Sequence, residues 1–183
     1  MTDPVPAASA LPSLPLRSAL VVGRKPRDFT FAPDDGARAA IAAALGLLEL
    51  PRLTFTGTLA PLGRSDLRLL AELRAEVVQP CTVTLAPVAS PIKESCDRRF
   101  VQDFREPEAE EFEIPADDIE ALPEVIDLAA IAIEALALAL PLYPRAEGAA
   151  FGQASFAVPG TAPLQPEDMK PFAGLAEKLK KPE

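Results

Sequence analysis

The strongest constraint on the fold is a stretch, beginning at Leu67, in which apolar and polar side chains alternate. Successive side chains of a β-strand point to opposite faces, so a period of two predicts a strand with one buried face. We therefore expect one long half-exposed strand, or two strands joined near Pro80. The apolar parity contains Leu67, Leu69, Ala71, Leu73, Ala75, Val77, Cys81, Val83 and Leu85, and the polar parity contains Arg68, Glu72, Arg74, Glu76, Thr82 and Thr84.

The residues that follow predict a partner for this strand. Pro87–Pro91 is typical of a turn, and Ile92–Phe104 is a second, less regular strand with Arg98 and Arg99 in its middle. A short connection joins antiparallel strands. The sequence therefore predicts a long central hairpin.

Shorter elements surround the expected hairpin. Apolar residues at helical spacing predict an amphipathic helix over Gly36–Leu48, which Asp34 or Asp35 can cap. Glu106–Glu124 is acidic and is expected to be a loop. The predicted fold class is α+β: an antiparallel sheet with a long central hairpin, one amphipathic helix, one buried Ala/Leu-rich helix and flexible termini. Further strands are expected at Leu16–Val22, Phe29–Phe31 and Arg52–Leu59.

The buried helix is expected within Val125–Pro144, a stretch of almost uninterrupted apolar character. Two interpretations compete, a membrane span and the central helix of a soluble domain. A span needs roughly 20 apolar residues, whereas the clean run is Leu128–Leu140, with Glu134 inside it and Pro141 closing it. An acid at the centre of a span costs about 2.5–3.5 kcal/mol. Both features favour the buried helix.

Composition excludes several classes of function. The chain has 183 residues and a formal net charge of −9, which argues against a dominant electrostatic hold on nucleic acid. It has no histidine, which removes every Ser-His, Cys-His and His-metal mechanism. Its two cysteines, Cys81 and Cys96, cannot form a common four-ligand zinc site. We expect no enzyme activity, no cofactor, no metal and no DNA partner.

The chain is expected to form one domain between two flexible segments. Residues 1–15 contain four prolines and predict an extended arm without the pattern of a secretory signal. Residues 16–145 form the single α+β domain. Residues 146–183 are expected to be a flexible, acidic and proline-rich tail that ends in a short amphipathic helix, Pro171–Lys181. We expect a cytoplasmic protein with free thiols and no contact with a membrane.

Arginines on or beside the expected hairpin are candidates for binding RNA phosphates. The alternative is that they are solvated strand positions paired with neighbouring carboxylates, Glu72, Glu76, Glu94 and Asp97. No glycine-aromatic pattern of an RNA-binding sheet accompanies them. Both interpretations stay open for these arginines, which are Arg64, Arg68, Arg74, Arg98 and Arg99.

Acidic residues and cysteines carry further expectations. Asp127 is a candidate partner-binding residue, and it can equally cap the apolar helix. A buried Glu134 would need a partner such as Arg98 or Arg99. The acidic run from Glu108 to Glu113 is either a solvated surface or a patch that holds a basic partner, such as a ribosomal protein. Cys81 and Cys96 are expected to be small buried apolar residues rather than reactive thiols or metal ligands.

Three segments in this order resemble the YceD family, also described as the domain of unknown function 177. The first is Cys81–Val88, followed by the strand that ends at Phe100. The second runs from Ile126-Asp127-Leu128 through Glu134 to Leu140–Pro144. The third is Lys170–Ala176, close to the family's terminal NPF-x-x-L.

The chain departs from this family pattern in its cysteines. Many members have a second cysteine three positions after the first, where this chain has Thr84. Some have further cysteines after the Leu-Pro segment, and Ala146–Gly152 has none. In addition, Lys170 stands where the family has asparagine before Pro-Phe. We therefore expect no metal here even if other members bind one.

The resemblance implies a bacterial, cytoplasmic, non-enzymatic factor needed for accumulation of 23S ribosomal RNA of the large subunit. The implied partner is ribosomal RNA or a precursor of the large subunit. The alternative is an acidic chaperone or adaptor for a basic ribosomal protein, without RNA contact of its own. In the C-terminal segment, the candidate binding residues are Phe172, Lys178 and Lys180.

Overall fold

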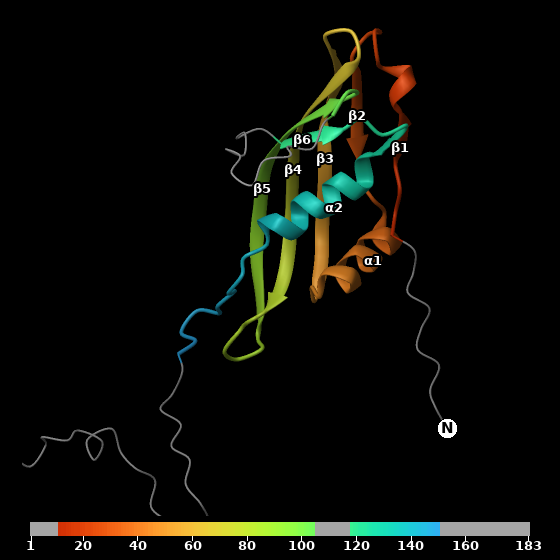
Figure 1. Ribbon diagram of the computed structural model, residues 1–183. Coiled ribbons are helices and arrows are strands. Elements are labelled where there is room, and N and C mark those ends of the chain that lie inside the picture. The colour runs from red at the N-terminus through yellow and green to blue at the C-terminus, as the bar shows by residue number, and fades with distance from the viewer. Residues whose placement is uncertain (1–10, 105–117, 151–183) are drawn as a thin grey trace, which may run out of the picture. The chain divides into compact units, whose positions relative to one another are not determined.

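The computed structural model describes residues 11–104 and 118–150. Residues up to Glu147 belong to one compact unit, with which the following description deals. Its centre is a five-stranded sheet in the order β2-β3-β4-β5-β6 (Figure 1). The strands are β2 (Arg27–Phe31), β3 (Glu49–Leu62), β4 (Asp66–Pro80), β5 (Pro87–Val101) and β6 (Asp118–Ala121).

Long antiparallel pairs dominate this sheet. β4 pairs with β5 without a break from Leu67↔Phe100 to Pro80↔Pro87, and it pairs with β3 on its other side. Only β6 runs parallel to its neighbour, along Arg98–Val101 of β5. A second sheet of two strands joins β1 (Pro15–Arg17) to β7 (Val125–Asp127), more than one hundred residues later. The predicted α+β class with its long central hairpin is confirmed.

Both α-helices begin at an aspartate cap. In α1 (Asp35–Leu45) the Asp34 carboxylate accepts the Ala37 N–H at 2.8 Å, and Gly46 ends the helix in the left-handed conformation. In α2 (Leu128–Ala139) the cap is Asp127. A short 3-10 helix, η1 (Ser18–Leu20), follows β1.

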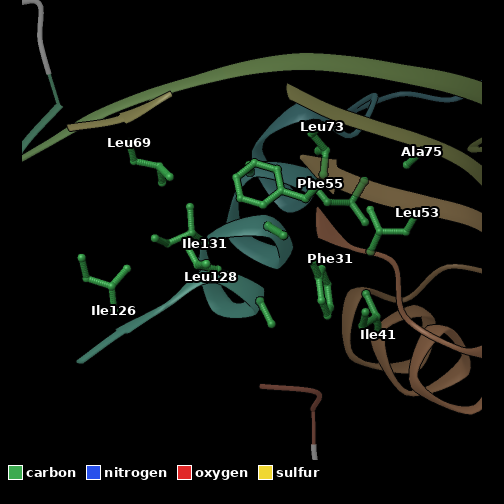
Figure 2. Packing of buried hydrophobic residues seen from close by; sticks show 14 of the residues in the cluster. Phe31, Ile41, Leu53, Phe55, Leu69, Leu73, Ala75, Ile126, Leu128 and Ile131 are labelled. Carbon is green, nitrogen blue, oxygen red and sulfur yellow. The ribbon is translucent and has the colours of Figure 1, made fainter. Parts of the chain in front are cut away.

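The core lies between one face of the sheet and the two helices. Leu53, Phe55 and Leu59 of β3 and odd-numbered side chains of β4 are buried there, together with Ile41 of α1 and Ile131 of α2. Figure 2 shows the Phe55 ring between the sheet and α2, and Phe31 beside Ile41. α2 buries one broad face against the sheet, and the buried residues are Leu128, Ala129, Ile131, Ala132, Ala135 and Leu136.

The structure corrects several predicted boundaries. The hairpin turn lies at residues 81–86, whereas the sequence predicted it at Pro87–Pro91. Both prolines lie in β5, where one edge of the strand has no described partner and a missing N–H does no harm. Cys81, Val83 and Leu85 therefore continue the apolar parity without belonging to a strand.

Other differences lie at the ends of the expected elements. The predicted strand Leu16–Val22 is a three-residue strand followed by η1, and part of the expected acidic loop forms β6. The expected helix from Val125 starts only at Leu128, because the three preceding residues pair with β1. Leu14 and Pro15 were both placed in the arm by the sequence. Leu14 donates its N–H to the Asp127 carboxylate, and Pro15 is the first residue of β1.

In the part of the chain that the structure covers, no helix has the length and apolarity needed to cross a membrane. α2 has 12 residues, far fewer than the roughly 20 that a span requires. The predicted C-terminal helix Pro171–Lys181 lies outside the described residues, as does most of the expected tail.

Candidate functional site

The two faces of the five-stranded sheet carry different chemistry. On β4, odd-numbered side chains face the core, and even-numbered side chains face the opposite side, which we call the outer face. On β5 the register reverses this parity, because Leu69 lies opposite Arg98. The buried residues of both helices belong to the core on the inner face, so the helices lie on that side of the sheet (Figure 1).

Five basic side chains gather on the outer face from β3 to β5, among the described residues. They come from three neighbouring strands and form two groups on this face: Arg68 lies opposite Arg99, and farther along the sheet Arg74 lies opposite Lys93, near Arg52. Two of them, Arg52 and Lys93, were not among the residues predicted from the sequence, although their parity matches that of Arg74 once the strands are paired. The five residues are Arg52, Arg68, Arg74, Lys93 and Arg99.

Carboxylates on the same face pair with most of these cations. Arg68 holds Asp97 with two hydrogen bonds, Nε–Oδ1 at 2.9 Å and Nη2–Oδ2 at 2.6 Å. Arg74 binds Glu72, which also lies 3.6 Å from Lys93. The hydrogen bond from Arg68 lowers the pKa of Asp97, and that from Arg74 lowers the pKa of Glu72. The predicted pairing of hairpin arginines with strand carboxylates is confirmed for Asp97 and Glu72.

The printed ion pairs of the outer face are all partly exposed to solvent. Their third carboxylate is Glu76, at 3.5 Å from Arg52. A hollow of about 240 Å³ lies among Arg52, Thr54, Arg74 and Lys93. Solvent-exposed ion pairs contribute only about 0–1 kcal/mol, so an incoming anion can displace their carboxylates at low cost.

Arg98 lies on the inner face, apart from the other arginines of the predicted set. Its side chain is 9% exposed, and it donates from Nη1 to Glu120 at 2.9 Å and pairs through Nη2 with Glu134 at 3.0 Å. Burial lowers the pKa of Arg98, but the hydrogen bond and charge of Glu134 and the charge of Glu120 outweigh it and raise that pKa. The predicted Glu134–Arg98 pair is confirmed. The Arg98 guanidinium is therefore engaged by carboxylates within the fold.

Adjacent residues of a strand always point to opposite faces, so Arg98 and Arg99 could not have served one surface. That signal was present in the sequence. Which of the two is buried depends on the register of β5 against β4, which the sequence does not reveal. Arg64 lies in the exposed turn between β3 and β4.

The Asp127 carboxylate caps α2 and accepts hydrogen bonds from four donors. It accepts the N–H groups of Ala129 and Ala130 from its own helix, at 3.0 and 3.3 Å. It also accepts the Ser13 hydroxyl at 2.6 Å and the Leu14 N–H at 2.9 Å. Burial raises the pKa of Asp127, but these hydrogen bonds outweigh it and lower that pKa. Its acceptor capacity is therefore used within the fold.

Cys81 has an environment that the sequence did not suggest. Its sulfur is buried and accepts the N–H groups of Val83, Thr84 and Ala146, each at 3.4 Å. The N–H of Ala146, followed by the contacts with Thr84, lowers the pKa of the Cys81 thiol to about 6, against the opposing effect of burial. These donors are backbone groups brought in by the chain's path, so no residue pattern signals them. Both cysteines are free thiols.

The described residues contain no group of three or more Cys, Asp or Glu side chains that could hold a metal ion. Phe172, Lys178 and Lys180, the candidates from the C-terminal segment, lie outside the described residues. The structure therefore brings Arg68, Arg74 and Arg99 together on one face, and it separates Arg98 and Asp127 from them.

Fold and surface together define an α+β protein in which, among the described residues, one face of the sheet is not covered by a helix and carries charged side chains. The family model "Large ribosomal RNA subunit accumulation protein YceD" matches residues 69–180, which is more than half of the chain. The chain belongs to the YceD family. The match starts within β4 and includes β5, β6, β7 and α2, that is, the hairpin, the Arg98 ion pairs and the Asp127 cap. No curated protein and no solved structure matches the chain.

Proposed function

We propose that this protein acts in the bacterial cytoplasm as a ribosome biogenesis factor, needed for accumulation of 23S ribosomal RNA, and that it acts by binding rather than catalysis. The family match carries this proposal, because the family is named for accumulation of the large ribosomal RNA. The absence of histidine from the sequence agrees with a non-enzymatic role. Its partner is ribosomal RNA or a precursor of the large subunit.

The outer face is the surface that we propose for RNA contact. Phosphate binding needs several cations on one surface, and Arg68, Arg74 and Arg99 meet this need with Arg52 and Lys93. RNA phosphates would replace Glu72, Glu76 and Asp97 as partners of these cations. Each exchange gives up only an exposed ion pair, which is why contact is possible despite a net charge of −9.

The experiment that tests the function measures the ratio of large- to small-subunit ribosomal RNA in cells depleted of this protein. We expect a selective fall in the large-subunit RNA, reversed by expression of the intact chain. An unchanged ratio would overturn the proposed function.

Charge reversal with a matched control tests whether the cations of the outer face bind RNA. Arg74→Glu with Lys93→Glu removes two outer-face cations, whereas Arg24→Glu with Lys25→Glu changes the net charge equally at an exposed turn. We expect the first pair to restore the RNA ratio poorly and the second to restore it fully. Against purified 23S RNA, the outer-face pair should lower the salt slope of log Kd by about 2. If the two double variants behaved alike, the outer face would not be the RNA-binding surface.

A second candidate function rests on the charge of the chain. A net charge of −9 and an acidic run from Glu106 to Glu124 favour a basic protein partner. The chain would then be an adaptor for one ribosomal protein and would have no RNA contact of its own. Co-purification of a basic ribosomal protein after nuclease treatment would support this function, and loss of all ribosomal proteins on nuclease treatment would contradict it.

A further inference from the structure

The strand β5 has an edge to which no described strand is paired over most of its length. β6 covers only Arg98–Val101, and Pro87–Asp97 pairs with β4 on one side alone within the described residues. An uncovered strand edge presents backbone N–H and C=O groups to which an extended peptide can pair. Only the backbone groups that point away from β4 are available for such pairing.

The hydrogen bonds of β5 show which residues direct their backbone N–H and C=O groups away from β4. The Val101 carbonyl accepts the Leu122 N–H at 2.9 Å, on the side away from β4. Because the β4–β5 register is unbroken, the other odd-numbered residues of β5 also direct their backbone groups outward. Pro87 and Pro91 share this parity, as expected for prolines at an open edge. They lack an N–H, so the run with outward donors at every second residue is Lys93, Ser95 and Asp97.

A groove adjoins this part of the edge. It measures about 320 Å³ and lies between β5 and the C-terminal half of α2. α2 crosses the inner face of the sheet and ends at β5 (Figure 1). Ala135, Leu138 and Ala139 form the apolar side of the groove, and the Leu138 side chain is 78% exposed. Inward side chains of an added strand would therefore meet an apolar surface.

The electrostatics of the groove favour a cation. Glu94 is exposed at the groove and forms no ion pair within the described part of the chain. Arg98 also lines the groove, but Glu120 and Glu134 balance its charge. The last turn of α2 has no basic residue to offset the partial negative charge of the helix C-terminus. A lysine or arginine side chain in the groove would lie near both the Glu94 carboxylate and the C-terminus of α2. The net charge of the chain, −9, also favours a basic partner.

We propose that the edge of β5 at Lys93–Asp97 binds an extended basic segment of another protein, which adds to the sheet beside β5. Backbone hydrogen bonds to Lys93, Ser95 and Asp97 hold the segment, an apolar side chain packs on Leu138, and a Lys or Arg side chain pairs with Glu94. The proposed site uses the backbone edge and the inner side of β5, whereas the outer face uses the side chains of Lys93 and Asp97. Peptide binding can be measured on the purified protein whether or not the RNA function holds.

The first test uses amide hydrogen exchange of the full-length protein, measured by NMR with a labelled ten-residue peptide of alternating Val and Lys as the probe. The N–H groups of Lys93, Ser95 and Asp97 should become protected when the peptide binds. Those of Ile92, Glu94 and Cys96 point to β4 and should be protected already. A matched Val-Glu peptide should bind roughly tenfold more weakly or not at all. Equal binding of both peptides would overturn the proposal.

A proline pair provides the matched variants. Ser95→Pro removes an outward N–H inside the proposed register, whereas Ala89→Pro removes one between the two natural prolines. We expect Ser95→Pro to weaken the Val-Lys peptide by about tenfold or more and Ala89→Pro to leave its Kd unchanged. Glu94→Lys, an exposed substitution that keeps the backbone, should also weaken binding. If Ser95→Pro does not fold, unchanged affinity of Glu94→Lys would alone contradict the proposal.

Other occupants would show a different result. Protection of Lys93, Ser95 and Asp97 without peptide, rising with protein concentration, would mean that a second copy of this chain uses the edge. Protection without peptide at every concentration would mean that the edge is already paired within the chain. Either result would overturn the proposed peptide site.

Discussion

At the scale of single residues, Asp127 joins two parts of the chain that are far apart in sequence. Its carboxylate accepts two N–H groups of α2 and two donors from Ser13 and Leu14. A single side chain thus starts the central helix and attaches the N-terminal segment to it. The family pattern around Ile126-Asp127-Leu128 has a structural explanation in this cap.

Asp127→Ala should destabilise the fold by about 1–3 kcal/mol at pH 7, because four donors lose their acceptor. Folding lowers the pKa of Asp127, so its contribution is full above the unfolded pKa of about 3.9 and is lost as the pH falls through the folded pKa. The difference in unfolding free energy between wild type and variant should therefore be constant near neutrality and shrink below about pH 4. Chemical denaturation at several pH values measures it.

Asp34→Ala is the control for this prediction. Asp34 also caps a helix, but it accepts only one backbone N–H and is exposed. Its loss should cost about 0.5–1 kcal/mol, less than that of Asp127. An equal cost for the two substitutions would contradict the role given to Ser13 and Leu14.

At the scale of elements, the sheet contains a row of small residues where its strands approach closely. Gly57 of β3 lies opposite Ala71 of β4, which lies opposite Cys96 of β5. A Cβ added at Gly57 would lie 2.6 Å from the Ala71 Cα and closer still to the Leu70 carbonyl oxygen. Backbone atoms cannot yield as a flexible side chain can, so this glycine is needed for the close approach of β3 and β4.

Gly57→Ala should therefore lower the unfolding free energy by about 1–3 kcal/mol or more, because two paired strands must separate locally. Gly36→Ala is the matched substitution. Gly36 lies in the first turn of α1 with only Asp34 Oδ1 within 4 Å of the added Cβ, at 3.6 Å, and alanine there should stabilise by up to about 1 kcal/mol. Thermal unfolding of both variants checks the prediction, and a neutral Gly57→Ala would contradict it.

At the scale of the whole molecule, Arg98 connects three elements that are far apart in sequence. It extends from β5 to Glu120 of β6 and to Glu134 of α2. These ion pairs join the parallel strand and the central helix to the hairpin. The pair with Glu134 is buried at the arginine and 55% exposed at the glutamate, so solvent screens part of its energy.

A double-mutant cycle of Arg98→Met and Glu134→Gln measures this connection. Each single substitution should cost about 1–3 kcal/mol, and the double variant should cost less than the two together, with a coupling of about 1–2 kcal/mol. The same cycle on Arg68 and Asp97, whose side chains are 38% and 48% exposed, should give a coupling below about 1 kcal/mol. A smaller coupling for Arg98 than for Arg68 would contradict the ranking.

Several features of the fold could be predicted because they depend on neighbours in sequence. The alternation from Leu67 predicts a half-buried strand, and helical spacing predicts α1 with a cap at Asp34 or Asp35, of which the structure has Asp34. The position of the turn was wrong, because proline marks both turns and open strand edges, and local sequence does not distinguish them. β6 was missed because four residues of an acidic segment become a strand only beside β5.

The sequence by itself determined the two-sided strand, the presence of an Ala/Leu-rich helix that contributes to the core and the absence of histidine chemistry, since these follow from residue type and period. Only the tertiary structure decided that Arg98 is buried while Arg99 lies on the outer face, and that Arg52 and Lys93 join Arg74 there. The physical reason is register. Period two separates the faces of each strand, but pairing between strands decides which face the helices cover and which edge stays open.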